Sequence, residues 1–152
     1  MKFKKLTDNR SFELSEYVIN YLKENKDNDI KIYLGCDSQN RGEFTTYATT
    51  LVFHIETSGC HVIYKKEKVP IIKDMWTRLW DEAERSIDTA IYLRNNGIEI
   101  DTIDLDYNTD VSHKSNKLVA AAVGYVQSLG FTARVKPDLL PAVYAADDIA
   151  HK

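Results

Sequence analysis

The chain has 152 residues, of which 43% are hydrophobic and 28% are charged, and its formal net charge is −3. This length and balance are typical of a globular protein with one core, so we expect a single domain over residues 1–152. No apolar run approaches the roughly 20 residues of a membrane span, and the first residues lack a signal-peptide pattern. We therefore expect a cytoplasmic protein with no membrane partner.

The first half of the chain predicts one helix followed by three strands. Apolar residues between Leu14 and Leu22 recur at helical spacing, and Ser11 is a candidate N-cap, which makes residues 1–28 a helical N-terminal extension. Three β-branched and aromatic runs follow at about 30–37, 45–55 and 60–69. A polar turn at 38–43 and a Gly-containing turn at 57–59 separate them, so we expect an antiparallel meander.

The second half alternates helices and strands. A helical stripe from about residue 72 ends at Gly97, and a strand follows at 98–106. A helix at 117–129, a short strand at 131–135 and a terminal helix at 138–152 complete the chain. The order β-β-β-α-β-α-β-α predicts a mixed α/β fold with a five-stranded mixed sheet, helices on both of its faces and the extra N-terminal helix.

Carboxylates lie at the ends of these expected elements. Asp37 closes the first core strand, and Asp104 and Asp106 close the fourth, with their side chains on the same face because they are two residues apart. If these strands are neighbours, their carboxyl ends bring Asp37 close to one of the two. Asp106 lies nearer the strand end and is the better candidate, with Asp104 as the alternative.

Two helices can add further acidic groups. Glu82 and Glu84 diverge by about 200° around their helix, so at most one faces the end of the sheet. Glu82 lies beside the apolar stripe and is preferred over Glu84. The terminal helix carries Asp147 and Asp148 after two small alanines, and only one of this pair is expected to be a direct ligand.

Several carboxylates that converge in a fold repel one another unless a cation binds them. Oxygen ligands suit Mg²⁺ or Mn²⁺, and two such ions about 4 Å apart are typical of phosphoryl-transfer sites. The pattern therefore favours phosphodiester hydrolysis. Cys36 and Cys60 lack C-x-x-C spacing, which argues against zinc and favours two buried reduced thiols.

The chain resembles the YkuK-type family of ribonuclease H-like proteins. The similar segments are Gly35-Cys-Asp-Ser-Gln, Asp104-Leu-Asp-Tyr-Asn, Ser115-Asn116, Gly130-Phe, Lys136-Pro137 and Ala145-Ala-Asp. This resemblance implies a ribonuclease H-like fold from about residue 30 onward. It also implies four acidic metal ligands, on the first core strand, the long helix, the fourth strand and the last helix. By resemblance these are Asp37, Glu82 or Glu84, Asp106 and Asp147.

The expected substrate is nucleic acid: RNA, an RNA–DNA hybrid or structured DNA. Polar residues beside the acidic groups are candidates for substrate contact, namely Ser38, Gln39, Asn108, Asn116 and Lys136. Each also has a local interpretation, as a loop hydrogen bond, a helix cap or a snorkelling side chain. The negative net charge favours an alternative in which the fold binds nucleic acid or protein without cleaving it. Basic residues could still cluster, for example Lys65, Lys66, Lys68 and Lys73.

Overall fold

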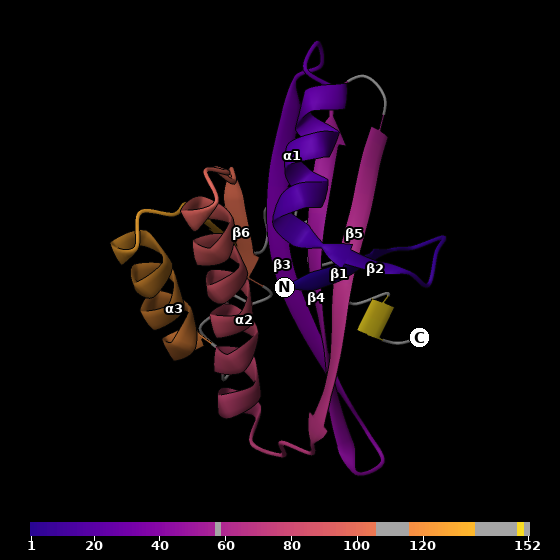
Figure 1. The fold of residues 1–152 in the computed structure, drawn as a ribbon. Coiled ribbons are helices and arrows are strands. Elements are labelled where there is room, and N and C mark those ends of the chain that lie inside the picture. Colours follow the sequence, from indigo (N-terminus) through magenta and orange to yellow (C-terminus); the bar gives the residue numbers. More distant parts are fainter. Residues whose placement is uncertain (57–58, 106–115, 136–148, 151–152) are drawn as a thin grey trace.

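The computed structural model describes residues 1–56, 59–105, 116–135 and 149–150. Its centre is a mixed sheet of seven strands in the order β2-β1-β5-β4-β3-β6-β7 (Figure 1). The strands are β1 (Lys2–Lys5), β2 (Ser11–Glu13), β3 (Ile30–Arg41), β4 (Phe44–Ile55), β5 (Gly59–Pro70), β6 (Thr102–Leu105) and β7 (Ala133–Val135). The helices are α1 (Leu14–Glu24), α2 (Met75–Asn95) and α3 (Asn116–Ser128). The mixed α/β fold expected from the sequence is confirmed.

The strand count differs from the expected five because the N-terminal segment adds two strands to the sheet. β1 pairs antiparallel with both β2 and β5. Ser11 was expected to cap a helix, but it belongs to β2 and pairs with Lys4, and α1 begins at Leu14. Phe3 is fully buried in the main hydrophobic core. Strands of three or four residues give little signal in the sequence, because pairing with neighbouring strands is what stabilises them.

The meander is the longest part of the sheet. β3, β4 and β5 have 12 residues each, and β3 pairs with β4 from Ile30–Ile55 to Arg41–Phe44. The polar segment from Ser38 to Arg41 was expected to be a turn, but it continues β3. The turn itself is confined to Gly42 and Glu43, and Gly42 has a φ of 62°, which a residue without a Cβ adopts readily. Asp37 therefore lies within a strand and not at its end.

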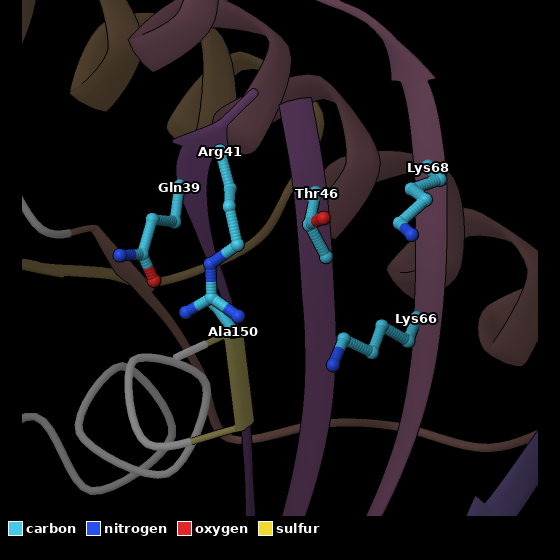
Figure 2. A pocket seen from close by; sticks show the side chains of 6 residues that line it. All are labelled: Gln39, Arg41, Thr46, Lys66, Lys68 and Ala150. Carbon is cyan, nitrogen blue, oxygen red and sulfur yellow. The ribbon is translucent and has the colours of Figure 1, made fainter. Parts of the chain in front are cut away.

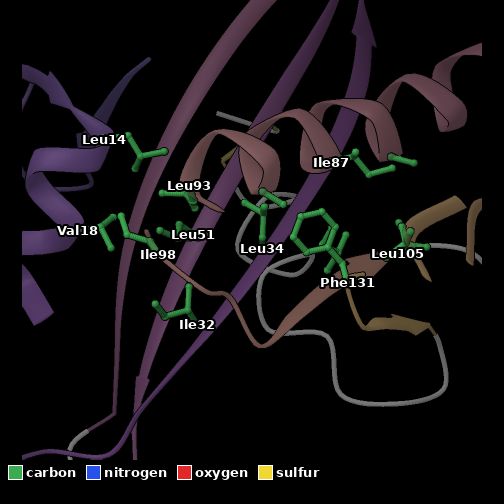
Figure 3. Packing of buried hydrophobic residues seen from close by; sticks show 14 of the residues in the cluster. Leu14, Val18, Ile32, Leu34, Leu51, Ile87, Leu93, Ile98, Leu105 and Phe131 are labelled. Carbon is green, nitrogen blue, oxygen red and sulfur yellow. The ribbon is translucent and has the colours of Figure 1, made fainter. Parts of the chain in front are cut away.

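One face of the sheet carries the main core. Leu34 and Leu51 from the meander pack with Ile87 and Leu93 from α2, and Phe131 closes the core beside β7 (Figure 3). α1 and α3 contribute to the same cluster, so the three described helices cover one face. On the other face, Ile149 and Ala150 pack against Ala48. Among the described helices, none has the length and apolar character needed to cross a bilayer.

The long helix is fixed at both ends by local chemistry. Asp74 caps its N-terminus by accepting hydrogen bonds from the backbone N–H and the hydroxyl of Thr77, at 3.0 and 2.6 Å. These hydrogen bonds hold the pKa of Asp74 below its usual value. At the other end Gly97 adopts a φ of 78° and the chain turns toward β6. The helix thus runs along β3 and presents one side to the middle of that strand.

Candidate active site at the end of β6

β3 has a neighbour on one side for only part of its length. β6 pairs with it in parallel from Tyr33–Thr102 to Gly35–Asp104, and β6 ends at Leu105. Asp37 lies two residues beyond this pairing, and only 7% of its surface is exposed. The edge of β3 at Asp37 is therefore the place where the parallel part of the sheet stops, which is where α/β sheets commonly bind ligands.

The long helix brings a second carboxylate to the same part of β3. Glu82 is only 4% exposed, and the hydroxyl of Ser38 donates a short hydrogen bond to its Oε2. Glu84 lies on the exposed side of α2, where it accepts a 2.9 Å hydrogen bond from Nε1 of Trp80. The helix thus directs Glu82 toward the sheet and Glu84 toward solvent.

A buried cysteine lies close to both of these acidic groups. Cys36 is 2% exposed, and Thr49 donates a hydrogen bond to its sulfur at 3.6 Å. Burial raises the pKa of the Cys36 thiol well above its ordinary value, and the negative charges of Glu82 and Asp37 raise it further. The two carboxylates therefore act on the same sulfur. Cys60 was expected to be buried as well, but it is exposed near the start of β5.

Asp104 is buried in an ion pair. Nε and Nη2 of Arg134 donate to its two oxygens at 3.1 and 3.0 Å, and the Thr102 hydroxyl donates to Oδ1 at 3.0 Å. The same guanidinium lies over the ring of Tyr33, 4.6 Å from its centroid. Bidentate pairing of this kind fixes a carboxylate in one geometry. Asp104 thus joins β6 to β7.

Several predicted site residues lie outside the described residues. They are Asp106, Asp147, Asp148, Asn108 and Lys136. Asn116 begins α3, and its side chain is likewise not described. The flanking residues are informative: Leu105 directly precedes Asp106, and Ile149 directly follows the Asp147–Asp148 pair. Ile149 and Ala150 pack on Ala48, which is the cross-strand partner of Asp37 on β4.

Oxygen chemistry at this edge suits a hard divalent cation. Asp37 and Glu82 are buried carboxylates on adjacent elements, and carboxylate oxygen is the ligand type that Mg²⁺ and Mn²⁺ prefer. Within the described part of the chain, no cluster of three or more acidic, histidine or cysteine side chains could hold a metal ion. These two carboxylates can therefore supply part of a metal site.

A cationic cavity lies on the sheet face opposite α2. It has a volume of about 200 Å³ and is lined by Gln39, Arg41, Thr46, Lys66, Lys68 and Ala150 (Figure 2). Gln39 was a predicted substrate contact, and Lys66 and Lys68 belong to the predicted basic cluster. Arg41 was missed, because it was placed in a turn and not on a strand. Strand alternation could have found the cluster, since Lys66 and Lys68 are two residues apart.

In this mixed sheet an antiparallel meander adjoins parallel strands, and buried carboxylates lie where the parallel pairing ends. This arrangement defines a class of α/β domains with an acidic site at the sheet edge. The ribonuclease H-like family matches residues 13–151 of this chain. The chain therefore belongs to the ribonuclease H-like family. No curated protein and no solved structure matches it closely.

Proposed function

We propose that this protein is a divalent-metal-dependent nuclease of the YkuK type that hydrolyses phosphodiester bonds in RNA, RNA–DNA hybrid or structured DNA. The observation that carries the proposal is that Asp37 on β3 and Glu82 on α2, which accepts a hydrogen bond from the adjacent Ser38, are both nearly buried beside the place where the parallel pairing ends. A carboxylate on the first core strand and one on the following helix are two of the four acidic positions that the family resemblance implies. Ordinary packing does not require two nearly buried carboxylates at one edge of a sheet.

The ends of the described segments support the remaining two positions. The fourth strand of the core, β6, pairs with β3 up to Gly35–Asp104 and ends at Leu105, the residue before Asp106 in the sequence. Ile149 and Ala150, which follow Asp147 and Asp148 in the sequence, pack on Ala48, the cross-strand partner of Asp37. We therefore assign Asp37, Glu82, Asp106 and Asp147 as the ligand set. Glu84 is disfavoured as a ligand by its exposure, and Asp104 by its pairing with Arg134.

The proposed site residues have distinct roles in this mechanism. Bound Mg²⁺ or Mn²⁺ would supply an activated water and neutralise charge at the reacting phosphate. Asp37 and Glu82 would hold the ions, and Ser38 would fix the orientation of Glu82 through its hydrogen bond. Gln39 lies two residues beyond Asp37 on the same face of β3 and would contact the substrate backbone. Asn108, Asn116 and Lys136 stay candidates for further substrate contacts.

The test compares the protein with Asp37→Asn and with Asp27→Asn, an exposed acidic residue near the end of α1. Cleavage of single strands, duplexes, hybrids and junctions is measured with Mg²⁺ and with Mn²⁺. We expect Asp37→Asn to lower the cleavage rate by at least ~100-fold, because removing one charge-stabilising group from an active site has an effect of this size. Asp27→Asn should cleave like the parent protein. Equal rates for the parent and Asp37→Asn would refute the assignment.

Metal binding is measured separately by thermal unfolding. A ligand that binds only the folded state raises its stability, so millimolar Mn²⁺ should raise the midpoint of the parent protein but not that of Asp37→Asn. Without metal, Asp37→Asn should unfold at the same or a higher temperature, because the substitution relieves repulsion between like charges. The alternative function, a domain that binds without cleaving, predicts no stabilisation by Mn²⁺ and no cleavage.

A further inference from the structure

The rows of residues across the meander connect Asp37 to the cationic cavity. Asp37 pairs with Ala48 on β4, and Ala48 pairs with Lys66 on β5. The next row on the same face consists of Gln39, Thr46 and Lys68. Because paired residues on neighbouring strands share a face, all of these side chains lie opposite α2. At a strand spacing of about 4.8 Å, the backbone of Lys66 is about 10 Å from that of Asp37.

Positive charge is concentrated on this face although the chain carries a net charge of −3. Figure 2 shows Lys66 and Lys68 extending from β5 toward β4, and Arg41 extending toward Ala150. A second cavity of about 190 Å³ continues across β5 to β1 and is lined by Lys2, Lys4, Ser11, Tyr64, Lys65 and Lys66. Lys66 lines both cavities, and neither is lined by an acidic residue among those described.

The cations of this face differ from those that pack beside α2. On the α2 side, Glu67 accepts ion pairs from Lys65 at 3.1 Å and from Arg85 at 2.9 Å. Lys66 and Lys68 are exposed and form no ion pair within the described part of the chain. Among the described residues, no acidic side chain neutralises their charge, and this charge attracts a polyanion to the face that carries Asp37.

An exposed aromatic ring narrows the class of polyanion. Phe44 begins β4 at the tip of the meander with 46% of its surface exposed, and Nζ of Lys68 lies 5.3 Å from the centroid of its ring. Cationic grooves with exposed aromatic rings are typical of sites for single-stranded nucleic acid, where phosphates contact the cations and unstacked bases contact the ring. A duplex keeps its bases stacked inside and cannot use such a ring.

We propose that a single strand of nucleic acid binds across this face, with phosphates at Lys66, Lys68 and Arg41 and a base on Phe44, and that the strand leads to Asp37. This inference rests on the proposed function, since it supplies the substrate path for the same site. It also names the substrate as unpaired nucleic acid, either RNA or DNA. The two sugars share the phosphate and base chemistry that this face recognises.

The experiment measures binding without catalysis. Fluorescence anisotropy is recorded in EDTA with labelled 12-nucleotide oligo(U) and oligo(dT) and with a 12-base-pair duplex. The variants are Lys66→Gln/Lys68→Gln, Phe44→Ala and the control Lys23→Gln/Lys26→Gln, which removes the same charge from the exposed end of α1. All the substituted side chains are exposed, and circular dichroism checks that each variant is folded.

For three phosphate contacts, the slope of log affinity against log salt should be near −2 for the parent protein and near −0.7 for Lys66→Gln/Lys68→Gln. We expect that variant to bind at least roughly fivefold more weakly at moderate salt, while Lys23→Gln/Lys26→Gln stays within about twofold of the parent. Phe44→Ala should also weaken binding by roughly fivefold or more, as loss of one stacked base does. The duplex should bind more weakly than either single strand.

Equal affinities for the two lysine variants, or binding of the duplex as tight as that of single strands with no effect of Phe44→Ala, would overturn the proposal. The outcome is separable from that of the nuclease assignment. Lysine-dependent binding without metal-dependent cleavage supports this site and refutes the nuclease. Cleavage that is unaffected by Lys66→Gln/Lys68→Gln, together with unchanged binding, refutes this site alone. Preference for oligo(U) or oligo(dT) identifies the sugar.

Discussion

Arg134 on β7 binds Asp104 on β6 through two parallel hydrogen bonds, 3.1 Å from Nε to Oδ1 and 3.0 Å from Nη2 to Oδ2. The Asp104 side chain is fully buried, whereas that of Arg134 is 23% exposed. β6 and β7 are short strands of four and three residues, and this ion pair joins them in addition to their backbone pairing. It holds the end of β6 in place beside Asp37, and the proposed catalytic edge depends on that placement.

Arg134→Ala should lower the free energy of unfolding by roughly 3 kcal/mol, because it leaves a buried carboxylate without its cation. The measurement is chemical denaturation at neutral pH. Adding Asp104→Asn to this variant should restore at least about 1 kcal/mol, since the uncompensated charge is then gone. A loss below about 1 kcal/mol for Arg134→Ala would mean that the ion pair contributes little to the fold.

Ser38→Ala tests whether the hydrogen bond to Glu82 orients a metal ligand. Loss of a group that orients a ligand typically costs 10- to 100-fold in metal affinity or activity, so the Mn²⁺ concentration for half-maximal cleavage should rise by about this factor. Stability should fall by only about 1 kcal/mol. Ser128→Ala is the control, because that hydroxyl donates to the carbonyl of Tyr125 at an exposed helix end. An unchanged Mn²⁺ requirement in Ser38→Ala would restrict the bond to a structural role.

His61 should make the protein less stable in mild acid. Burial lowers the pKa of His61 below its ordinary value of 6.5, and the positive charge of Lys5 lowers it further. The unfolded chain then binds a proton more readily than the folded one, so stability is full above pH 6.5 and falls as the pH drops below it. The Tyr17 hydroxyl lies 2.5 Å from Nε2 of His61, in a stack with Tyr21 and Phe53.

The measurement is denaturation of the parent protein and of His61→Gln between pH 5 and pH 8. The difference between their stabilities should change in the parent's favour as the pH rises through the His61 transition. Carboxylates that titrate below about pH 5 affect both proteins equally and cancel in the comparison. A difference that stays constant across this range would show that His61 has the same pKa in the folded and unfolded states.

The two cysteines should differ sharply in reactivity. Cys60 is exposed, whereas Cys36 is buried and its pKa is raised by burial and by the Glu82 carboxylate, so little thiolate forms. Iodoacetamide at pH 8 should alkylate one thiol in the native protein and both in denaturant, as counted by mass spectrometry. Cys60→Ser should show no native alkylation. Rapid modification of Cys36 in that variant would mean that the Asp37 edge of β3 opens in solution.

The sequence by itself predicted the class of fold and most of the elements that carry the site. The meander, α2, α3 and the parallel strand β6 could be found because long periodic runs bury one face and end at Gly97 or Gly130. The sequence did not reveal β1 and β2, since strands of three or four residues depend on their partners. It also placed Asp37 at a strand end, because polar residues from Ser38 to Arg41 resemble a turn until β4 pairs with them.

The residue types needed for metal and phosphate chemistry were fixed by the sequence, as were the acidic pairs Glu82/Glu84 and Asp104/Asp106. Only the tertiary structure distinguished Glu82 from Glu84 and gave Asp104 its partner. Packing of α2 on β3 buried Glu82 and left Glu84 in water, and β7 supplied Arg134 to neutralise Asp104. The cationic face likewise required the sheet, because hydrogen bonding between strands places Lys66 on one surface with Asp37 and Arg41, although Lys66 is distant from both in the chain.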